Sequence, residues 1–148
     1  MADRIEKTIE LKAPVERVWR ALTDPGEFGA WFRVRLDGPF AVGEITTGQI
    51  TYVGYEHYRW VSRTTELDRS RRRLAFTWTH PEDPANPQPG DPSTLVEFEL
   101  EPTQDGTRLH LVESGFEAIP AERRADIVRS NEEGWQIQMT NIRHHVEG

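Results

Sequence analysis

Cysteine is absent from the 148 residues, which excludes disulfide bonds, thiolate nucleophiles and cysteine-ligated metal sites. No apolar run approaches the roughly 20 residues of a membrane span, and no signal-peptide pattern opens the chain. Basic residues are outnumbered, because 18 Lys and Arg face 25 Asp and Glu and leave a formal net charge of −7. This balance argues against a general nucleic-acid binder. We therefore expect a single cytoplasmic domain that neither inserts into a membrane nor binds nucleic acid.

The motifs of several enzyme classes are missing as well. No Gly-rich phosphate loop is present, and no serine lies in a G-x-S-x-G elbow. The five histidines lack H-x-x-x-H spacing, and the adjacent His144 and His145 would point about 100° apart on a helix. We therefore expect no metal site, no cofactor and no direct ATPase activity.

Large rings dominate the apolar residues that are present. Apolar residues make up 36% of the chain, and they include five Trp, three Tyr and six Phe. Each such ring can bury roughly 150–250 Å². A modest apolar fraction concentrated in large rings predicts a core that is built mainly from aromatic side chains.

The N-terminal part of the chain predicts one strand and two short helices. Residues 4–11 alternate between apolar and polar side chains, which is typical of a half-buried strand. Apolar residues recur at helical spacing after Pro14, which we place in the first helical position. Asp24 is the predicted N-cap of the second helix, with Pro25 at its first position and Glu27 at its third.

The middle of the chain predicts an antiparallel meander. Its expected strands lie near residues 33–36, 44–52, 58–67, 72–80, 94–100 and 107–114. Asp37-Gly38 and Asp105-Gly106 predict tight turns. Residues 80–93 hold five of the ten prolines and predict a long loop. The basic cluster of residues 69–73 falls on an expected turn, which is solvated or, as the less favoured alternative, a phosphate-binding or nucleic-acid-binding patch.

The C-terminal part predicts one long helix over residues 121–147, about 40 Å long at 1.5 Å per residue. Its apolar stripe consists of Val128, Trp135, Met139, Ile142 and Val146. A helix of this length can lie across an entire small sheet. One strand, two short helices, a meander and a terminal helix together predict an α+β fold.

Several local strings follow one another in the order of a known family. They are Ala13–Trp19, Ala21–Pro25, Trp31-Phe32, Arg72–Trp78, Gly106–Leu109, Ser114–Phe116 and Gly134-Trp135. With them the chain resembles the activator of heat-shock protein 90 ATPase homologue family, within the START-like (SRPBCC, helix-grip) superfamily. The resemblance implies a single domain over residues 1–148, in which a curved antiparallel sheet wraps around the C-terminal helix and encloses a largely apolar cavity. It implies no fixed set of catalytic residues.

The candidate site is this space between helix and sheet. Its expected lining is Trp31, Phe32, Phe76, Trp78, His80, Phe98, Glu113, Phe116, Trp135, Met139 and Ile142. Asn131 and Gln138 could join from the helix, and the Pro-rich loop and residues 28–40 are candidates for the entrance. Such a lining predicts a small hydrophobic or aromatic ligand. The alternative is that the rings only fill the core.

Glu113 and His80 form an acid–base pair if the cavity brings them together, and burial would then raise the pKa of Glu113. The alternative is a surface ion pair or a solvated rim position. Two other functions stay open. One is a co-chaperone-like module that binds a protein partner through an outer face, and the other is an enzyme of the cyclase or hydratase type, by analogy of fold alone.

Overall fold

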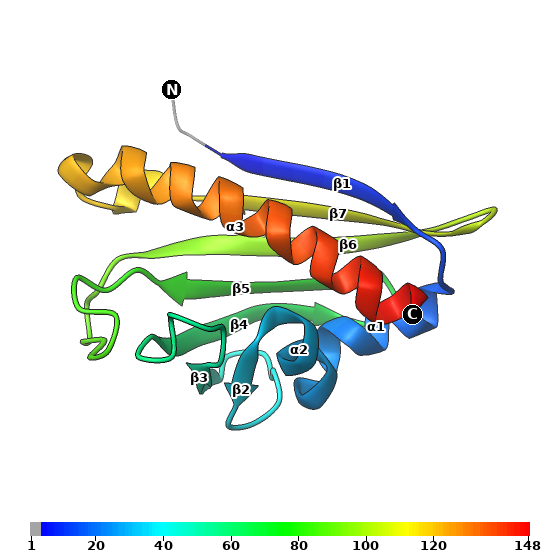
Figure 1. Cartoon of the computed structure of the whole chain (residues 1–148), viewed down its shortest axis with the longest axis horizontal. Helices are drawn as coiled ribbons and strands as arrows, with labels where there is room; N and C mark the ends of the chain where they lie inside the picture. Colours follow the sequence, from blue (N-terminus) through cyan, green and yellow to red (C-terminus); the bar gives the residue numbers. More distant parts are fainter. Residues whose placement is uncertain (1–3) are drawn as a thin grey trace.

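The computed structural model describes residues 4–148 (Figure 1). In chain order its elements are β1 (Ile5–Leu11), α1 (Val15–Thr23), α2 (Pro25–Phe32), β2 (Val34–Leu36), β3 (Ile45–Ile50), β4 (Arg59–Asp68), β5 (Arg73–Thr79), β6 (Ser93–Thr103), β7 (Gly106–Ser114), a 3-10 turn (Phe116–Ala118) and α3 (Ala121–Glu147).

All seven strands form one antiparallel sheet in the order β1-β7-β6-β5-β4-β3-β2. The strands from β2 to β7 are a simple meander, and β1 pairs with β7 at the far edge. Helix α3 crosses the sheet diagonally, and α1 and α2 lie near its C-terminal end (Figure 1). The predicted α+β architecture is confirmed, with strand ends that differ from prediction by a few residues.

The core lies between α3 and the sheet and is aromatic, as predicted. Phe76 of β5 and Phe98 of β6 are fully buried, and Trp135 of α3 is 2% exposed. The ring centres of Phe98 and Trp135 are 5.9 Å apart in an edge-to-face arrangement. Such pairs contribute about 0.5–1.5 kcal/mol beyond the area that they bury. The apolar stripe of α3 therefore faces the inward residues of the central strands.

The start of α2 follows the predicted capping pattern. The Asp24 carboxylate accepts a hydrogen bond of 2.9 Å from the backbone N–H of Glu27, and Pro25 is the first helical residue. Helix α1 begins one residue later than predicted, because Pro14 has an extended backbone and serves as its N-cap. These two caps fix the entry and the turn of the helical segment between β1 and β2.

The two predicted turns have different outcomes. The prediction of a tight hairpin at Asp37-Gly38 is wrong, because a longer connection joins β2 to β3 and the positive φ of 84° falls at Gly43. The tight turn before Gly106 is confirmed, since Thr103 pairs with Gly106. A Cβ at Gly106 would lie 2.1 Å from the carbonyl oxygen of Leu11, so glycine is required there by close approach.

Ion pairs occupy the basic cluster of residues 69–73, whose predicted turn between β4 and β5 is confirmed. Arg69 pairs with Glu16 at 2.8 Å. Arg73 pairs with Glu66, Glu97 and Glu99 at 3.0, 3.2 and 2.9 Å. Glutamates of the same chain therefore form ion pairs with both of these arginines.

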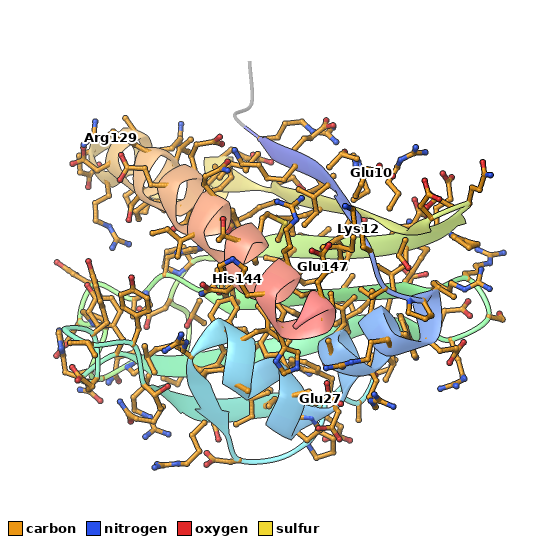
Figure 2. The ribbon with its side chains drawn as sticks, turned by 45° about the vertical axis from the view of Figure 1, so that its right-hand side comes forward. Glu10, Lys12, Glu27, Arg129, His144 and Glu147 are labelled. Carbon is orange, nitrogen blue, oxygen red and sulfur yellow. The ribbon has the colours of Figure 1, made fainter. Side chains whose placement is uncertain are left out.

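The C-terminal end of α3 is tied to the segment after β1. The backbone N–H of Lys12 donates to the Glu147 carboxylate at 2.7 Å, and the two residues lie close together in Figure 2. Arg143 donates to the carbonyl oxygen of Glu10 at 3.3 Å. Among residues 4–148, no helix is both long enough and apolar enough to cross a membrane.

Candidate ligand-binding cleft

A buried carboxylate is the polar centre of the helix–sheet contact. Glu113 of β7 is completely buried, and its two oxygens accept hydrogen bonds from the indole N–H groups of Trp78 (2.8 Å) and Trp135 (2.9 Å). The Thr94 hydroxyl donates at 2.6 Å, and the Asn131 amide lies 3.1 Å from both oxygens. The donors come from β5, β6 and α3, so one carboxylate joins three elements.

These donors decide the charge of Glu113. Burial alone raises the pKa of this carboxyl, but the polar groups of His80, Thr94 and the two indoles lower it by more, and the net pKa lies below its ordinary value. The expectation of a raised pKa is therefore wrong. Glu113 is ionised at neutral pH and acts as a hydrogen-bond acceptor, not as a proton donor.

His80 and Glu113 do meet, through Thr94. The Nε2 atom of His80 lies 3.6 Å from the Glu113 carboxylate and 2.7 Å from the Thr94 hydroxyl oxygen. An ionised carboxylate can only accept, so the single hydroxyl proton of Thr94 must point to Glu113. The contact between Thr94 and His80 then requires a proton on Nε2 of His80.

Two adjoining cavities open beside this network. One, of about 350 Å³, lies between α3 and the segment 50–58, and the other, of about 460 Å³, lies between α3 and the segment 79–84. Their shared lining consists of Phe32, Ile50, Tyr58, Trp78, Ser130 and Asn131. We call the two together the cleft.

Three mutually packed rings form the inner wall of the cleft. Trp78 and Trp135 stack at 5.5 Å between ring centres, and Phe32 lies 6.0 Å from each of them. The N–H groups of both indoles point to Glu113. The N–H edge of each indole is therefore hydrogen-bonded to Glu113 and not to the cleft. Of the three rings, Trp78 is half-buried and presents apolar ring surface to the cleft, whereas Phe32 and Trp135 are 8% and 2% exposed.

The predicted lining residues separate into two groups. Phe32, Trp78, His80 and Trp135 line the cleft, and Glu113 lies directly behind two of them. The others line neither cavity and are packed in the core, namely Trp31, Phe76, Phe98, Phe116, Met139 and Ile142. The open space is thus displaced from the centre of the sheet toward the middle of α3.

Only some residues of the predicted entrance line the cleft. Pro81 and Pro84 of the Pro-rich loop line the cleft, and so do the predicted helix residues Asn131 and Gln138. Of residues 28–40, Phe32 lines both cavities, whereas Phe28 and Phe40 are buried in the core.

A cluster of tyrosines at the cleft was missed by sequence reasoning. Tyr52, Tyr55 and Tyr58 follow β3, and their neighbouring ring centres are 5.8 and 5.4 Å apart. Their exposed fractions are 38%, 49% and 37%, which is high for aromatic residues. The sequence did carry a signal, because all three tyrosines of the chain fall in one Y-x-x-Y-x-x-Y string that spans the connection between the expected strands 44–52 and 58–67.

The meander, the long helix packed on it and the cleft beside that helix define a helix-grip domain of the START-like class. The chain belongs to the family of Activator of Hsp90 ATPase homolog 1-like proteins, whose model matches residues 12–147. No protein of curated function is similar enough to match.

Solved structures with the same fold come from several bacteria. Protein MLL2253 of Mesorhizobium loti is 25% identical with a TM-score of 0.76, over 98% of this chain and 97% of that one. A protein of Arthrobacter aurescens is 20% identical with a TM-score of 0.81, over 99% and 87%. DynU16, described as a putative protein in the dynemicin biosynthetic locus, is 21% identical with a TM-score of 0.75, over 99% of this chain and 48% of its own.

Proposed function

We propose that this protein binds a small hydrophobic or aromatic molecule in the cleft. The observation that carries the proposal is the inner wall of Phe32, Trp78 and Trp135, whose indole N–H groups are turned away to Glu113. Ligand sites are typically concave, mostly apolar and roughly 300–1,000 Å³ in volume, and both cavities fall in that range at about 350 and 460 Å³.

Gly134 supports the proposal from the helix side. Glycine inside a helix costs about 1 kcal/mol relative to alanine. Apart from its chain neighbours and the backbone of its own helix, a Cβ added at Gly134 would have no heavy atom of residues 4–148 within 4 Å, so packing against other elements does not require a glycine there. The residue lines the cleft. A missing side chain at this position keeps the space beside Trp135 open.

The exposed apolar surface also favours a ligand over a protein partner. Among residues 4–148, four of the seven large exposed apolar side chains line the cleft, namely Tyr52, Tyr55, Tyr58 and Ile137, whereas Val42, Ile45 and Val53 lie outside it. A docking face on the outer side of the sheet would instead need a sizeable apolar patch there. Ordering of the tyrosine rings over a bound molecule would bury further apolar area, at about 25 cal/mol per Å² before ordering costs.

A pair of substitutions at Gly134 tests the proposal. Gly134→Phe places a ring in the cleft, whereas Gly134→Ala changes the helix propensity in the same direction and leaves most of the space. We expect naphthalene compounds to change tryptophan fluorescence in the wild-type protein and in Gly134→Ala, and to have no effect in Gly134→Phe. Equal binding by both variants would place the ligand elsewhere, and no binding across a broad apolar library would overturn the proposed function.

A further inference from the structure

Glu113 also fixes which polar atoms face the cleft. An ionised carboxylate can only accept, so every polar group around it must turn a donor inward. Asn131 therefore directs its amide nitrogen, and not its carbonyl oxygen Oδ1, to Glu113. In residues 4–148 no side chain donates to this oxygen, and the sole buried side-chain polar atom without a partner is Thr64 Oγ1. Asn131 Oδ1 is thus accessible, and Asn131 lines both cavities of the cleft.

The same reasoning applies to His80. Its Nε2–H is committed to Thr94, and no described residue hydrogen-bonds to its Nδ1. Because Nδ1 is also absent from the buried atoms that lack a partner, it is accessible, and His80 lines the cleft. In the neutral imidazole, Nδ1 is then an acceptor.

The donors that surround Glu113 are already in use. Both indole N–H groups bond to Glu113, and the Gln138 amide donates to the carbonyl oxygen of Phe32 at 2.9 Å. Arg123 donates to the His80 carbonyl oxygen at 3.2 Å, and Arg59 donates to the Gln49 side chain at 3.2 Å. The remaining N–H groups of these two arginines and the hydroxyls of Ser130 and the tyrosines are donors of other parts of the cleft, away from Glu113. The wall next to Glu113 therefore offers ring surface and unpartnered acceptors.

We infer that the ligand is an aromatic molecule with a hydroxyl or N–H donor on its ring, which it presents to Asn131 Oδ1 and His80 Nδ1. This inference rests on the proposed function and specifies its ligand class. The ring lies against Trp78 and Trp135, and the donor satisfies acceptors that an apolar ligand would leave buried and unpaired. A carboxylate ligand is disfavoured, because it would bring a negative charge and more acceptors toward the ionised Glu113.

Three naphthalene probes of similar size test this inference by titration calorimetry. We expect 1-naphthol to bind the wild-type protein about ten-fold more tightly than 1-methoxynaphthalene, the equivalent of one net hydrogen bond. We expect 1-naphthoate to bind most weakly. In Asn131→Ala and His80→Phe the preference for 1-naphthol should shrink, while 1-methoxynaphthalene binds as before and so reports an intact cleft. Thr140→Ala, at an exposed position of α3 that lines neither cavity, is the matched control and should keep the wild-type preference.

Each outcome separates this inference from the proposed function. Equal affinity for 1-naphthol and its methyl ether, or strongest binding of 1-naphthoate, overturns the donor requirement and leaves the cleft as a site. An unchanged preference for 1-naphthol in both variants overturns the assignment to Asn131 and His80. If none of the three probes binds the wild-type protein, the proposed function fails together with this inference.

Discussion

At the scale of single residues, Glu113 determines both stability and the chemistry of the cleft. A fully buried carboxylate is costly unless donors surround it, and here four side chains from three elements donate to it. Those donors in turn have no other acceptor of equal strength. The stability of the helix–sheet contact therefore depends on the charge of one side chain as well as on ring packing.

Glu113→Gln should destabilise the protein by about 2–4 kcal/mol, because the new amide offers one acceptor oxygen and turns an N–H₂ group toward existing donors. Chemical denaturation with an isothermal readout measures the change. Glu99→Gln is the control, since Glu99 pairs with Arg73 on the surface and is 49% exposed, so its loss should cost less than about 1 kcal/mol. Equal losses in the two variants would show that the buried network has no special weight.

At the scale of helices and strands, Glu27 joins the three helices at one end of the molecule. Its carboxylate lies 2.5 Å from Arg17 and 2.7 Å from Arg20, both on α1, and 3.0 Å from His145 on α3. Burial raises the pKa of Glu27, but the hydrogen bonds from His145, Arg17 and Arg20 lower it by more, to about 2. The Glu27 carboxylate therefore connects α2, on which it lies, to α1 and to α3; its position is labelled in Figure 2.

Glu27→Gln should lower the free energy of unfolding at pH 7 by about 1–3 kcal/mol. The upper figure follows from the pKa shift of Glu27. The lower figure allows for solvent screening, because the Glu27 side chain is 24% exposed. Denaturant unfolding at pH 7 measures the loss. Glu16→Gln is the matched control on α1, because its partner Arg69 is 73% exposed and little loss is expected. A loss at Glu27 no larger than at Glu16 would contradict the joining role.

Helix α3 contains a residue that lowers the stability of the fold, the glycine at position 134. Gly134→Ala should stabilise the protein by about 0.5–1 kcal/mol, because alanine favours the helix and its Cβ would meet no described atom of another element within 4 Å. Thermal unfolding measures the gain, and Gly148→Ala at the C-terminal cap, where a Cβ would lie 2.6 Å from the His144 carbonyl oxygen, should give none. A loss of stability in Gly134→Ala would reveal a packing need at this position.

At the scale of the whole molecule, the sequence predicted the fold better than the site. Period-two and helical spacing place Phe76, Phe98 and Trp135 on inward faces, because those faces must be buried somewhere. Spacing does not say whether the facing position is filled, so Phe76 and Trp78 looked equivalent, although only Trp78 borders open space. The lowered pKa of Glu113 escaped prediction for a related reason, since its donors come from distant parts of the chain.

Acid unfolding of the whole molecule should report both Glu113 and Glu27. These two carboxylates have folded-state pKa values below their ordinary value of 4.5, so the unfolded chain binds more protons as the pH falls. The stability that they contribute is complete above about pH 4.5. It is lost as the pH falls through each folded pKa, which for Glu27 is about 2. The free energy of unfolding should therefore decrease steeply below pH 4.5.

The double variant Glu27→Gln, Glu113→Gln should reduce this slope by more than either single variant does, while other carboxylates such as Asp68, whose pKa is also lowered, keep a residual dependence. The two sites should act additively, because their contacts on α3, Trp135 and His145, are about 15 Å apart along the helix. Denaturant unfolding between pH 7 and pH 3 measures the slope. Variants with the wild-type slope would show that these two carboxylates do not control the acid limit of the fold.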